Sequence, residues 1–279
     1  MIYPVPTLDH VVINVRDRID EAAETWRRLG FTLTARGYHT LGSMNHLAMF
    51  GTDYLELIAA PPGDTRRPEI MGAPEGLNSL VFGTEDSAAT YAAMREAGVP
   101  VFPPGEFSRP VALPEGNRDA VFRTVRLMPG TISAGRLYFC HHFTRDLVWR
   151  DEWRHHANGT TGVARAIIAA RDPSELGALF GRMFGADALR PIDGGLALTV
   201  GVSRFDVVTP ETLHAEFDDA SPDGGGRDSY MAALEFRTRS LDSAWRAMER
   251  GGVAGARREK DRVIVPASAA FGATLAFCL

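Results

Sequence analysis

Hydrophobic and polar positions change their period in a regular order along the first sixty residues. The run LDHVVINV (8–15) is apolar and rich in β-branched residues, which predicts a strand. Residues 16–31 then place apolar side chains at helical spacing and predict a helix that ends at Gly30. The segments FTLTARGYH, NHLAMF and YLELIAA follow, separated by glycine-containing turns, and predict three more strands.

The same order of strand, helix and three strands recurs three times. Apolar runs at 77–84, 163–170 and 232–238 precede helical stretches at 85–99, 171–186 and 239–253. Glycine accepts the left-handed conformation that ends many helices, and each predicted helix ends at one: Gly30, Gly98, Gly185 and the pair Gly251–Gly252. Each helix also begins near a polar residue suited to an N-cap: Asp17, Asp86, Asp172 and Ser240. The chain therefore contains four predicted βαβββ modules.

These modules predict an α+β fold. Since one module cannot bury its sheet alone, we expect the modules to pair into two curled mixed β-sheet half-barrels with the helices outside. Each pair would enclose a cavity, where ligand sites are usually found. Modules one and two are expected to form an N-terminal domain (1–157), and modules three and four a C-terminal domain (158–279). The polar segment RHHANGTTG is the expected linker between them.

Composition narrows the classes of partner. A chain of 279 residues can bury a full core, and its net charge of −5 leaves no basic surplus to neutralise nucleic-acid phosphates. No apolar run approaches the ~20 residues of a membrane span, and no signal peptide is visible. Two cysteines give no disulfide framework. We expect a cytoplasmic protein with a small-molecule substrate, without nucleic acid or membrane as partner. The sequence leaves a homodimer open.

Two adjacent histidines in the predicted strand YFCHHFT raise the question of a site. Neighbouring strand residues point to opposite faces, so His141 and His142 cannot both join one site. GTDYLE and GRLYFC begin the last strands of modules one and two, and their alignment puts His142 on the face that carries Glu56. His141 falls on the other face.

His10, Glu56 and His142 then come from the first and last strands of the first two modules. Two imidazoles and one carboxylate are a typical ligand set for a divalent transition metal with open coordination positions. We predict that these residues bind Fe, Mn, Zn, Ni or Co, and that Glu56 is also the catalytic base. The simpler alternatives are a buried core histidine for His10 and a solvent-facing carboxylate for Glu56.

Substrate contacts are predicted from Asn45, Arg109 and Arg123. The arginines lie on expected inner strands, where a buried guanidinium needs an anionic partner. That partner would be a substrate carboxylate or phosphate, or a structural Asp or Glu. Asn45 would hydrogen-bond a substrate or stabilise a turn. Aromatic residues would line the rest of the cavity: Tyr54, Phe82, Phe122 and Tyr138.

The C-terminal half carries different residues at the corresponding positions. Arg165 replaces His10 and Asp206 replaces Glu56. Arginine does not bind metals at neutral pH, so an Arg165–Asp206 ion pair is expected in place of a metal there.

The repeat, the opening LDHVVINV and the segment YLELI resemble the vicinal oxygen chelate superfamily, which includes glyoxalase I, extradiol dioxygenases and bleomycin-resistance proteins. More narrowly, GSMNHLAMFGTDYLELIA and FCHHFTRDLVWRDEWRHHANG resemble glyoxalase-like domain proteins. The resemblance implies metal ligands on first and last strands of modules, which matches His10, Glu56 and His142. Alignment by eye puts Ser79 at the module-two position where extradiol dioxygenases and many glyoxalases carry a histidine.

Three functions fit this sequence. The first is a divalent-metal-dependent enzyme of the glyoxalase or lyase/isomerase type, acting on a small substrate with vicinal oxygens. The second is an extradiol-type ring-cleaving dioxygenase that uses Fe(II). The third is a binding protein without catalysis that sequesters a drug-like or aromatic ligand.

Overall fold

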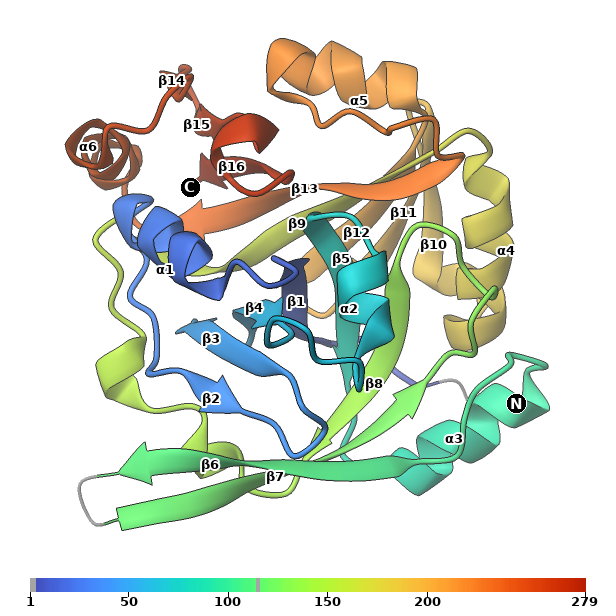
Figure 1. The fold of residues 1–279 in the computed structure, drawn as a ribbon. Coiled ribbons are helices and arrows are strands. Elements are labelled where there is room, and N and C mark those ends of the chain that lie inside the picture. The colour runs from blue at the N-terminus through green and yellow to red at the C-terminus, as the bar shows by residue number, and fades with distance from the viewer. Residues whose placement is uncertain (1–3, 114–115) are drawn as a thin grey trace.

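Two eight-stranded mixed sheets form the frame of the protein (Figure 1). The computed structural model describes residues 4–113 and 116–279. The first sheet has the strand order β2-β3-β4-β1-β5-β8-β7-β6, and the second has β10-β11-β12-β9-β13-β16-β15-β14. The two orders correspond strand by strand, which confirms four βαβββ modules in an α+β fold.

The elements of each module lie in the predicted order. The first sheet and its helices comprise β1 (Leu8–Asn14), α1 (Ile19–Arg28), β2 (Gly37–Tyr38), β3 (Met44–Met49), β4 (Tyr54–Ala59), α2 (Pro68–Gly72), β5 (Gly76–Gly83), α3 (Ser87–Glu96), β6 (Gly105–Leu113), β7 (Gly116–Arg126) and β8 (Arg136–His142). The second comprises β9 (Thr160–Ala170), α4 (Pro173–Phe184), β10 (Leu189–Ile192), β11 (Gly195–Val200), β12 (Ser203–Val208), α5 (Pro210–Phe217), β13 (Ser229–Thr238), α6 (Leu241–Gly251), β14 (Arg257–Arg258), β15 (Arg262–Val265) and β16 (Thr274–Cys278).

Three of the four predicted N-caps are confirmed. The side chains of Asp86, Asp172 and Ser240 accept hydrogen bonds from backbone N–H groups in the first turns of α3, α4 and α6. The prediction for Asp17 was wrong, because α1 begins one residue later and its N-cap is Arg18, which makes no side-chain cap. Two acidic side chains in the first turn of α1, Asp20 and Glu21, stabilise the helix instead by interacting with the positive end of its dipole.

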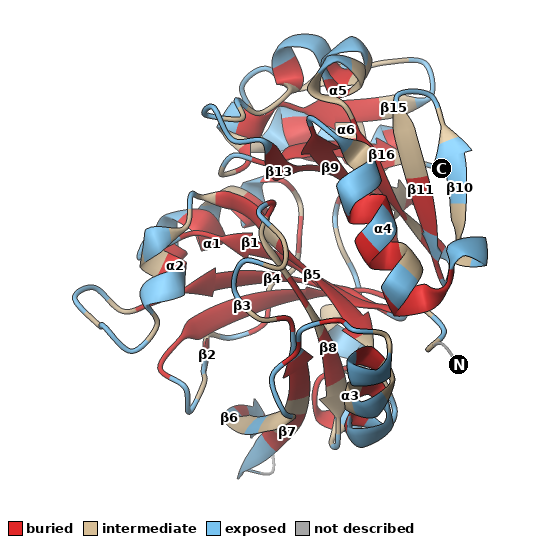
Figure 2. Ribbon diagram, turned by 90° about the vertical axis from the view of Figure 1, so that its right-hand side faces the viewer, coloured by how far each residue is buried: buried red, intermediate tan, exposed pale blue. Residues whose placement is uncertain are grey.

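The outer faces of both sheets pack against helices and against each other. Figure 2 shows buried residues along the strands, while the helices α3, α4 and α5 expose one side to solvent. Aromatic contacts join the halves, with ring centroids of Phe31 and Phe236 5.3 Å apart and of Phe82 and Phe205 5.5 Å apart. The prediction that Phe82 lines the cavity was therefore wrong. None of the described helices is long and apolar enough to cross a membrane.

Strand pairing corrects one equivalence between the modules. His10 pairs with Tyr54 across β1 and β4, and the residue of β5 that pairs with Tyr138 is Val81. Val81, not Ser79, therefore occupies the module-two position that corresponds to His10. The ladder between β1 and β5 contains two register shifts, and an ungapped alignment of the two segments cannot show them.

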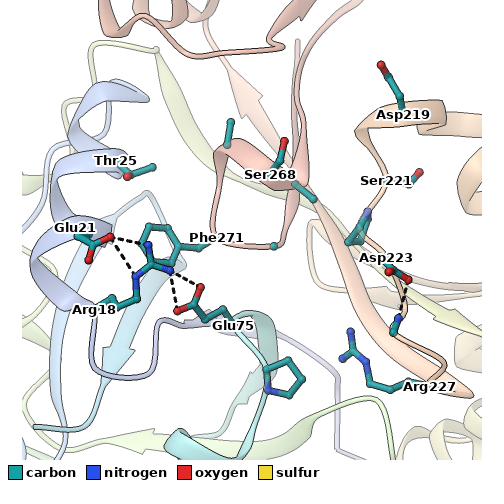
Figure 3. A pocket seen from close by; sticks show the side chains of 16 residues that line it. Arg18, Glu21, Thr25, Glu75, Asp219, Ser221, Asp223, Arg227, Ser268 and Phe271 are labelled. Atoms are coloured by element: carbon teal, nitrogen blue, oxygen red, sulfur yellow. Dashed lines mark hydrogen bonds and ion pairs between the residues drawn. The ribbon is translucent and has the colours of Figure 1, made fainter. Parts of the chain in front are cut away.

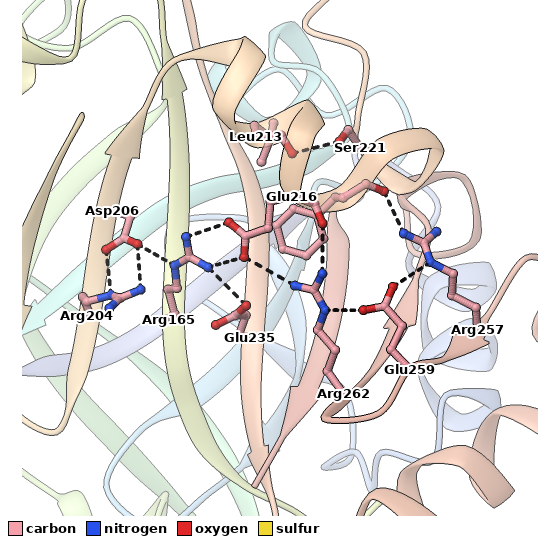
Figure 4. A network of polar contacts seen from close by, with 11 residues as sticks. Arg165, Arg204, Asp206, Leu213, Glu216, Ser221, Glu235, Arg257, Glu259 and Arg262 are labelled. Carbon is pink, nitrogen blue, oxygen red and sulfur yellow. Dashed lines mark hydrogen bonds and ion pairs between the residues drawn. The ribbon is translucent and has the colours of Figure 1, made fainter. Parts of the chain in front are cut away.

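The corresponding position in the C-terminal half holds the predicted ion pair. Arg165 Nε lies 2.6 Å from Asp206 Oδ2, and the guanidinium also contacts Glu216 and Glu235 (Figure 4). Glu216 belongs to α5, whose Leu213 and Phe217 lie in the apolar cluster of this sheet's inner face. The inner space of the second sheet is thus filled by a helix and a network of paired charges.

The two halves also meet through polar contacts around the predicted linker. His156 Nε2 lies 2.8 Å from the carbonyl oxygen of Met49, and the backbone N–H of Thr32 donates to His156 Nδ1. Asp53 Oδ1 accepts a hydrogen bond from the backbone N–H of Val163, 2.9 Å away. The segment between the two sheets is therefore held in place by hydrogen bonds to the first half.

Replacement of Asp53 by Asn is expected to change the pH dependence of stability. Burial raises the pKa of Asp53 to about 6, although the Val163 N–H and nearby Arg237 favour the ionised form. Between about pH 4 and 6 the folded protein keeps a proton that the unfolded chain releases, so wild-type stability falls as pH rises through this window. The D53N variant has no carboxyl group at this position and so lacks this loss. The difference in free energy of unfolding between D53N and wild type should therefore shift in favour of D53N by on the order of 1–3 kcal/mol from pH 4 to pH 7.

Urea unfolding at both pH values measures this difference. The matched control is D193N, at an exposed aspartate. A D53N difference that does not change with pH would contradict the prediction.

Candidate active site in the first half-barrel

A cavity of about 650 Å³ lies on the inner side of the first sheet. His10, Asn45, Glu56 and Arg109 reach it from β1, β3, β4 and β6. Three of the predicted aromatic residues are also in its wall: Tyr54, Phe122 and Tyr138. The structure thus brings four predicted site residues together.

A β-bulge in β1 adds a carboxylate that sequence reasoning missed. Leu8 pairs with Phe82 and His10 pairs with Val81, so Asp9 is an extra residue in the ladder. Its Oδ1 lies 2.5 Å from His10 Nδ1 and 3.1 Å from His142 Nε2. The sequence signal was an acidic residue within an apolar strand.

Asp9 is ionised in this position. Burial alone would raise its pKa, but the charge of His142 and the hydrogen bonds from both imidazoles outweigh burial and hold the pKa well below its usual range. A carboxylate can only accept hydrogen bonds when ionised, so His10 Nδ1 and His142 Nε2 are the donors. One buried anion therefore orients two histidine rings.

The other nitrogen of His10 faces the cavity. Its Nε2 lies 3.2 Å from the Tyr138 hydroxyl and 3.6 Å from Glu56 Oε2. The imidazole is stacked on Tyr54, with ring centroids 4.4 Å apart. Since Nδ1 donates to Asp9, Nε2 is the His10 nitrogen that faces the Glu56 carboxylate and the Tyr138 hydroxyl.

Glu56 is held as an anion by its neighbours. Asn45 Nδ2 donates to Glu56 Oε1 over 2.6 Å, and His39 Nε2 lies 3.8 Å from the same oxygen. Burial would raise the pKa of Glu56, but His39, His10, Asn45 and Arg109 together lower it. Burial lowers the pKa of His39 to about 4, so this imidazole is neutral at pH 7. His39 lies in the turn between β2 and β3, and it was not among the predicted site residues.

The two adjacent histidines occupy opposite faces, as predicted from strand parity. His142 packs inside the half-barrel, with its ring centroid 4.9 Å from that of Phe122 and 5.0 Å from that of Trp149. His141 lies on the outer face beside Phe143, with 4.3 Å between ring centroids.

Arg123 does not reach the cavity. It pairs with His141 across β7 and β8 and therefore lies on the outer face. Its guanidinium contacts Glu106 over 2.8 Å and lies 4.8 Å from the centre of the Phe143 ring. The prediction that Arg123 contacts a substrate was therefore wrong. Neighbouring strand residues point to opposite faces, and it is Phe122 that points into the cavity.

The inner residues also include a possible metal site. Ligand atoms of Asp9, Cys140 and His142 all lie within 4.8 Å of one another. Carboxylate oxygen, imidazole nitrogen and sulfur are donors that zinc and iron accept. Burial raises the pKa of the Cys140 thiol, which would have to lose its proton to bind a metal. Among the described residues, this is the one group of three such ligand atoms that lie close together, and neither His10 nor Glu56 belongs to it.

Two other hollows lie near the junction of the halves. One, of about 590 Å³, is lined by Asp9, Cys140 and His142 among others, and Glu56 is not in its lining. The other, of about 770 Å³, is an open groove between α1 and the loops near Ser221 and Ser268 (Figure 3). In that groove, Arg18 is already paired with Glu21 and Glu75.

Replacement of Asp9 by Asn is expected to destabilise the fold at neutral pH by about 1–3 kcal/mol, because two buried imidazoles lose their ionised acceptor. The folded-state pKa of Asp9 is lowered, so its contribution is fully present above the ordinary aspartate pKa of about 4 and is lost as pH falls from there toward the lowered pKa. Urea unfolding of wild type and D9N at pH 7 and pH 2 tests this. The control is D17N, at an exposed position. A deficit of equal size at both pH values would contradict the assignment.

Comparisons with solved structures support the fold. A hypothetical protein from Staphylococcus aureus is 12% identical with a TM-score of 0.68, covering 98% of this chain and 99% of that one. A mutant of 4-hydroxymandelate synthase from Streptomyces coelicolor is 12% identical with a TM-score of 0.55, covering 98% and 92%. A xylose isomerase-like TIM barrel/4-hydroxyphenylpyruvate dioxygenase fusion protein is 15% identical with a TM-score of 0.56, covering 99% and 50%.

A search of curated proteins finds no match. The family model for the glyoxalase-like domain matches residues 8–184, which is more than half of the chain and includes every candidate site residue named above. The chain belongs to the glyoxalase-like domain family, within the vicinal oxygen chelate superfamily.

Proposed function

We propose that this protein is a divalent-metal-dependent enzyme of the glyoxalase type, a lyase or isomerase that acts on a small substrate with vicinal oxygens. His10, Glu56 and His142 would hold the metal, which could be Fe, Mn, Zn, Ni or Co. The observation that carries the proposal is the approach of His10 Nε2 to Glu56 Oε2 at 3.6 Å inside a buried cavity. A nitrogen lone pair and a carboxylate oxygen at this separation suit a shared cation.

The chain's own residues would divide the remaining work. Asp9 fixes the tautomer and ring orientation of His10, as carboxylates do for many metal-binding histidines. Glu56 is ionised and can accept a proton from a substrate carbon or hydroxyl within reach. Asn45 holds Oε1 by its hydrogen bond, so Oε2 is the oxygen that faces His10. When bound, a divalent metal would polarise the two substrate oxygens.

His142 donates a hydrogen bond to Asp9 through Nε2, and its Nδ1 is buried without a partner among the described residues. A nitrogen that carries a proton cannot bind a metal, so His142 would bind through Nδ1, or through Nε2 once that hydrogen bond is released. The alternative group of Asp9, Cys140 and His142 would place the metal at the 590 Å³ hollow that these three residues line. Substitutions at residues that the two groups do not share separate these arrangements.

Protein purified without added metal is expected to contain about one equivalent of a transition metal. H10A and H142A should each retain less than about a tenth of it, since loss of a ligand weakens binding strongly. C140A should retain the metal, and H141A, on the outer face, is the matched control. Elemental analysis by mass spectrometry gives the metal content directly.

The outcomes of this measurement differ clearly. Retention by H10A together with loss from C140A would move the metal to the Asp9, Cys140 and His142 group. Absence of metal from the wild-type protein, together with ligand binding that survives in H10A and H142A, would favour the non-catalytic binding protein.

An extradiol-type dioxygenase is the second candidate function, because one similar structure is named as a 4-hydroxyphenylpyruvate dioxygenase fusion protein. A glyoxalase-type reaction consumes no oxygen, so we expect no oxygen uptake by the metal-loaded protein with a panel of catechols. An oxygen electrode measures this, with H10A as the control. Uptake that is stoichiometric with catechol and absent in H10A would replace the first proposal by the second.

A further inference from the structure

Arg109 is a buried charged residue of the first half-barrel whose guanidinium has no hydrogen-bond partner among the described residues. Its side chain reaches the cavity from β6, and the residue is only 4% exposed. Within the described residues no group accepts a hydrogen bond from its guanidinium, and its Nη2 is fully buried without a partner. A buried guanidinium normally has an anion beside it, because burial without one is costly.

Three other arginines at the same cavity are paired with carboxylates, and a fourth, Arg126, is exposed to solvent. Arg66 contacts Asp64, Arg67 contacts Glu69 over 2.6 Å, and Arg136 lies 3.8 Å from Glu69. These arginines are at the mouth, where a carboxylate and solvent share the charge. Arg109 is deeper. Glu56 interacts with it through charge, but no carboxylate among the described residues forms a hydrogen bond or ion pair with its guanidinium.

A second unsatisfied group lies close to Arg109. Asn45 donates its amide N–H to Glu56, but its Oδ1 is buried with no hydrogen-bond partner in the described part of the protein. Gly37 on β2 makes room for both side chains, because a Cβ there would lie 3.1 Å from Arg109 Nη1 and closer still to Asn45 Oδ1. A donor and an acceptor are thus left free at one end of the cavity.

The wall beside these groups is aromatic. Phe107 and Phe122 are stacked with ring centroids 5.1 Å apart, and Tyr54 and Tyr138 lie further in. Such a wall suits an apolar or aromatic part of a ligand.

We propose that the cavity binds a monoanionic carboxylate with an apolar or aromatic tail, and that Arg109 holds the carboxylate. Asn45 Oδ1 accepts a hydrogen bond from a hydroxyl of the same ligand. The inference rests on the site of the proposed function and names the class of its substrate.

The charges of the cavity favour a carboxylate over a phosphate. One guanidinium matches one negative charge and offers two parallel N–H donors to two oxygens. A phosphate dianion would bring an excess negative charge toward ionised Glu56 in a buried space.

Binding of matched probes tests the proposal without reference to catalysis. Titration calorimetry would compare 3-phenylpropanoate, its neutral amide 3-phenylpropanamide and the dianion phenethyl phosphate. Wild type should bind the carboxylate about 10- to 100-fold more tightly than the amide, as expected for a charge-assisted hydrogen-bonded pair in a buried site. Phenethyl phosphate should bind more weakly than the carboxylate.

Variants of Arg109 should remove this preference. R109Q should bind the two probes with affinities within about threefold of each other, while R109K keeps part of the preference through its charge. R123Q, on the outer face, is the matched control and should behave as wild type. R109Q should also unfold at a higher temperature than wild type, because an unpaired buried charge is gone.

The results decide between the proposal and its failure. Equal affinity of wild type for carboxylate and amide, tighter binding of the phosphate, no binding of any probe at millimolar concentration, or an unchanged preference in R109Q would overturn it. Metal content measured on the same R109Q sample separates the two proposals. Loss of carboxylate preference with full metal content supports Arg109 alone, and carboxylate preference in a protein that binds no metal refutes only the metal-dependent function.

Discussion

The buried carboxylate of Asp9 determines how the interior of the first half-barrel is organised. It accepts hydrogen bonds from His10 and His142 and, through His10, defines which nitrogen faces Glu56. This contact depends on the β-bulge at Asp9, which adds one residue to β1. Without the extra residue, Asp9 and His10 would point to opposite faces, and the carboxylate would enter the apolar layer that contains Val11.

The two halves share one fold but differ in whether the charged side chains on the inner face of the sheet are paired. In the second half, Arg165 binds Asp206, Glu216 and Glu235, and α5 fills the remaining space (Figure 4). In the first half the space is open, and the polar atoms Arg109 Nη2 and Asn45 Oδ1 have no partner among the described residues. Native proteins satisfy nearly all buried polar groups, so these two atoms support the ligand proposed for the first half.

The repeat and strand parity predicted most of the fold, because hydrophobic period and glycine positions are local properties. Parity also separated His141 from His142. The same alternation lets only one of the neighbours Phe122 and Arg123 face the cavity, so the prediction that both contribute to it was wrong for Arg123. The bulge at Asp9 could not be predicted, since ladder register depends on a partner strand some seventy residues away.

The position of His142 shows how one hydrogen bond separates two chemical states of the site. While Nε2 donates to Asp9, His142 strengthens the orientation of the carboxylate that in turn holds His10. If Nε2 instead binds a metal, Asp9 loses one donor and its negative charge must be balanced by that metal. Both states keep His10 in place, because its Nδ1 hydrogen bond to Asp9 is separate from the His142 contact. His10 and Glu56 are therefore the fixed part of the candidate centre, and His142 is the part that a bound ion would change.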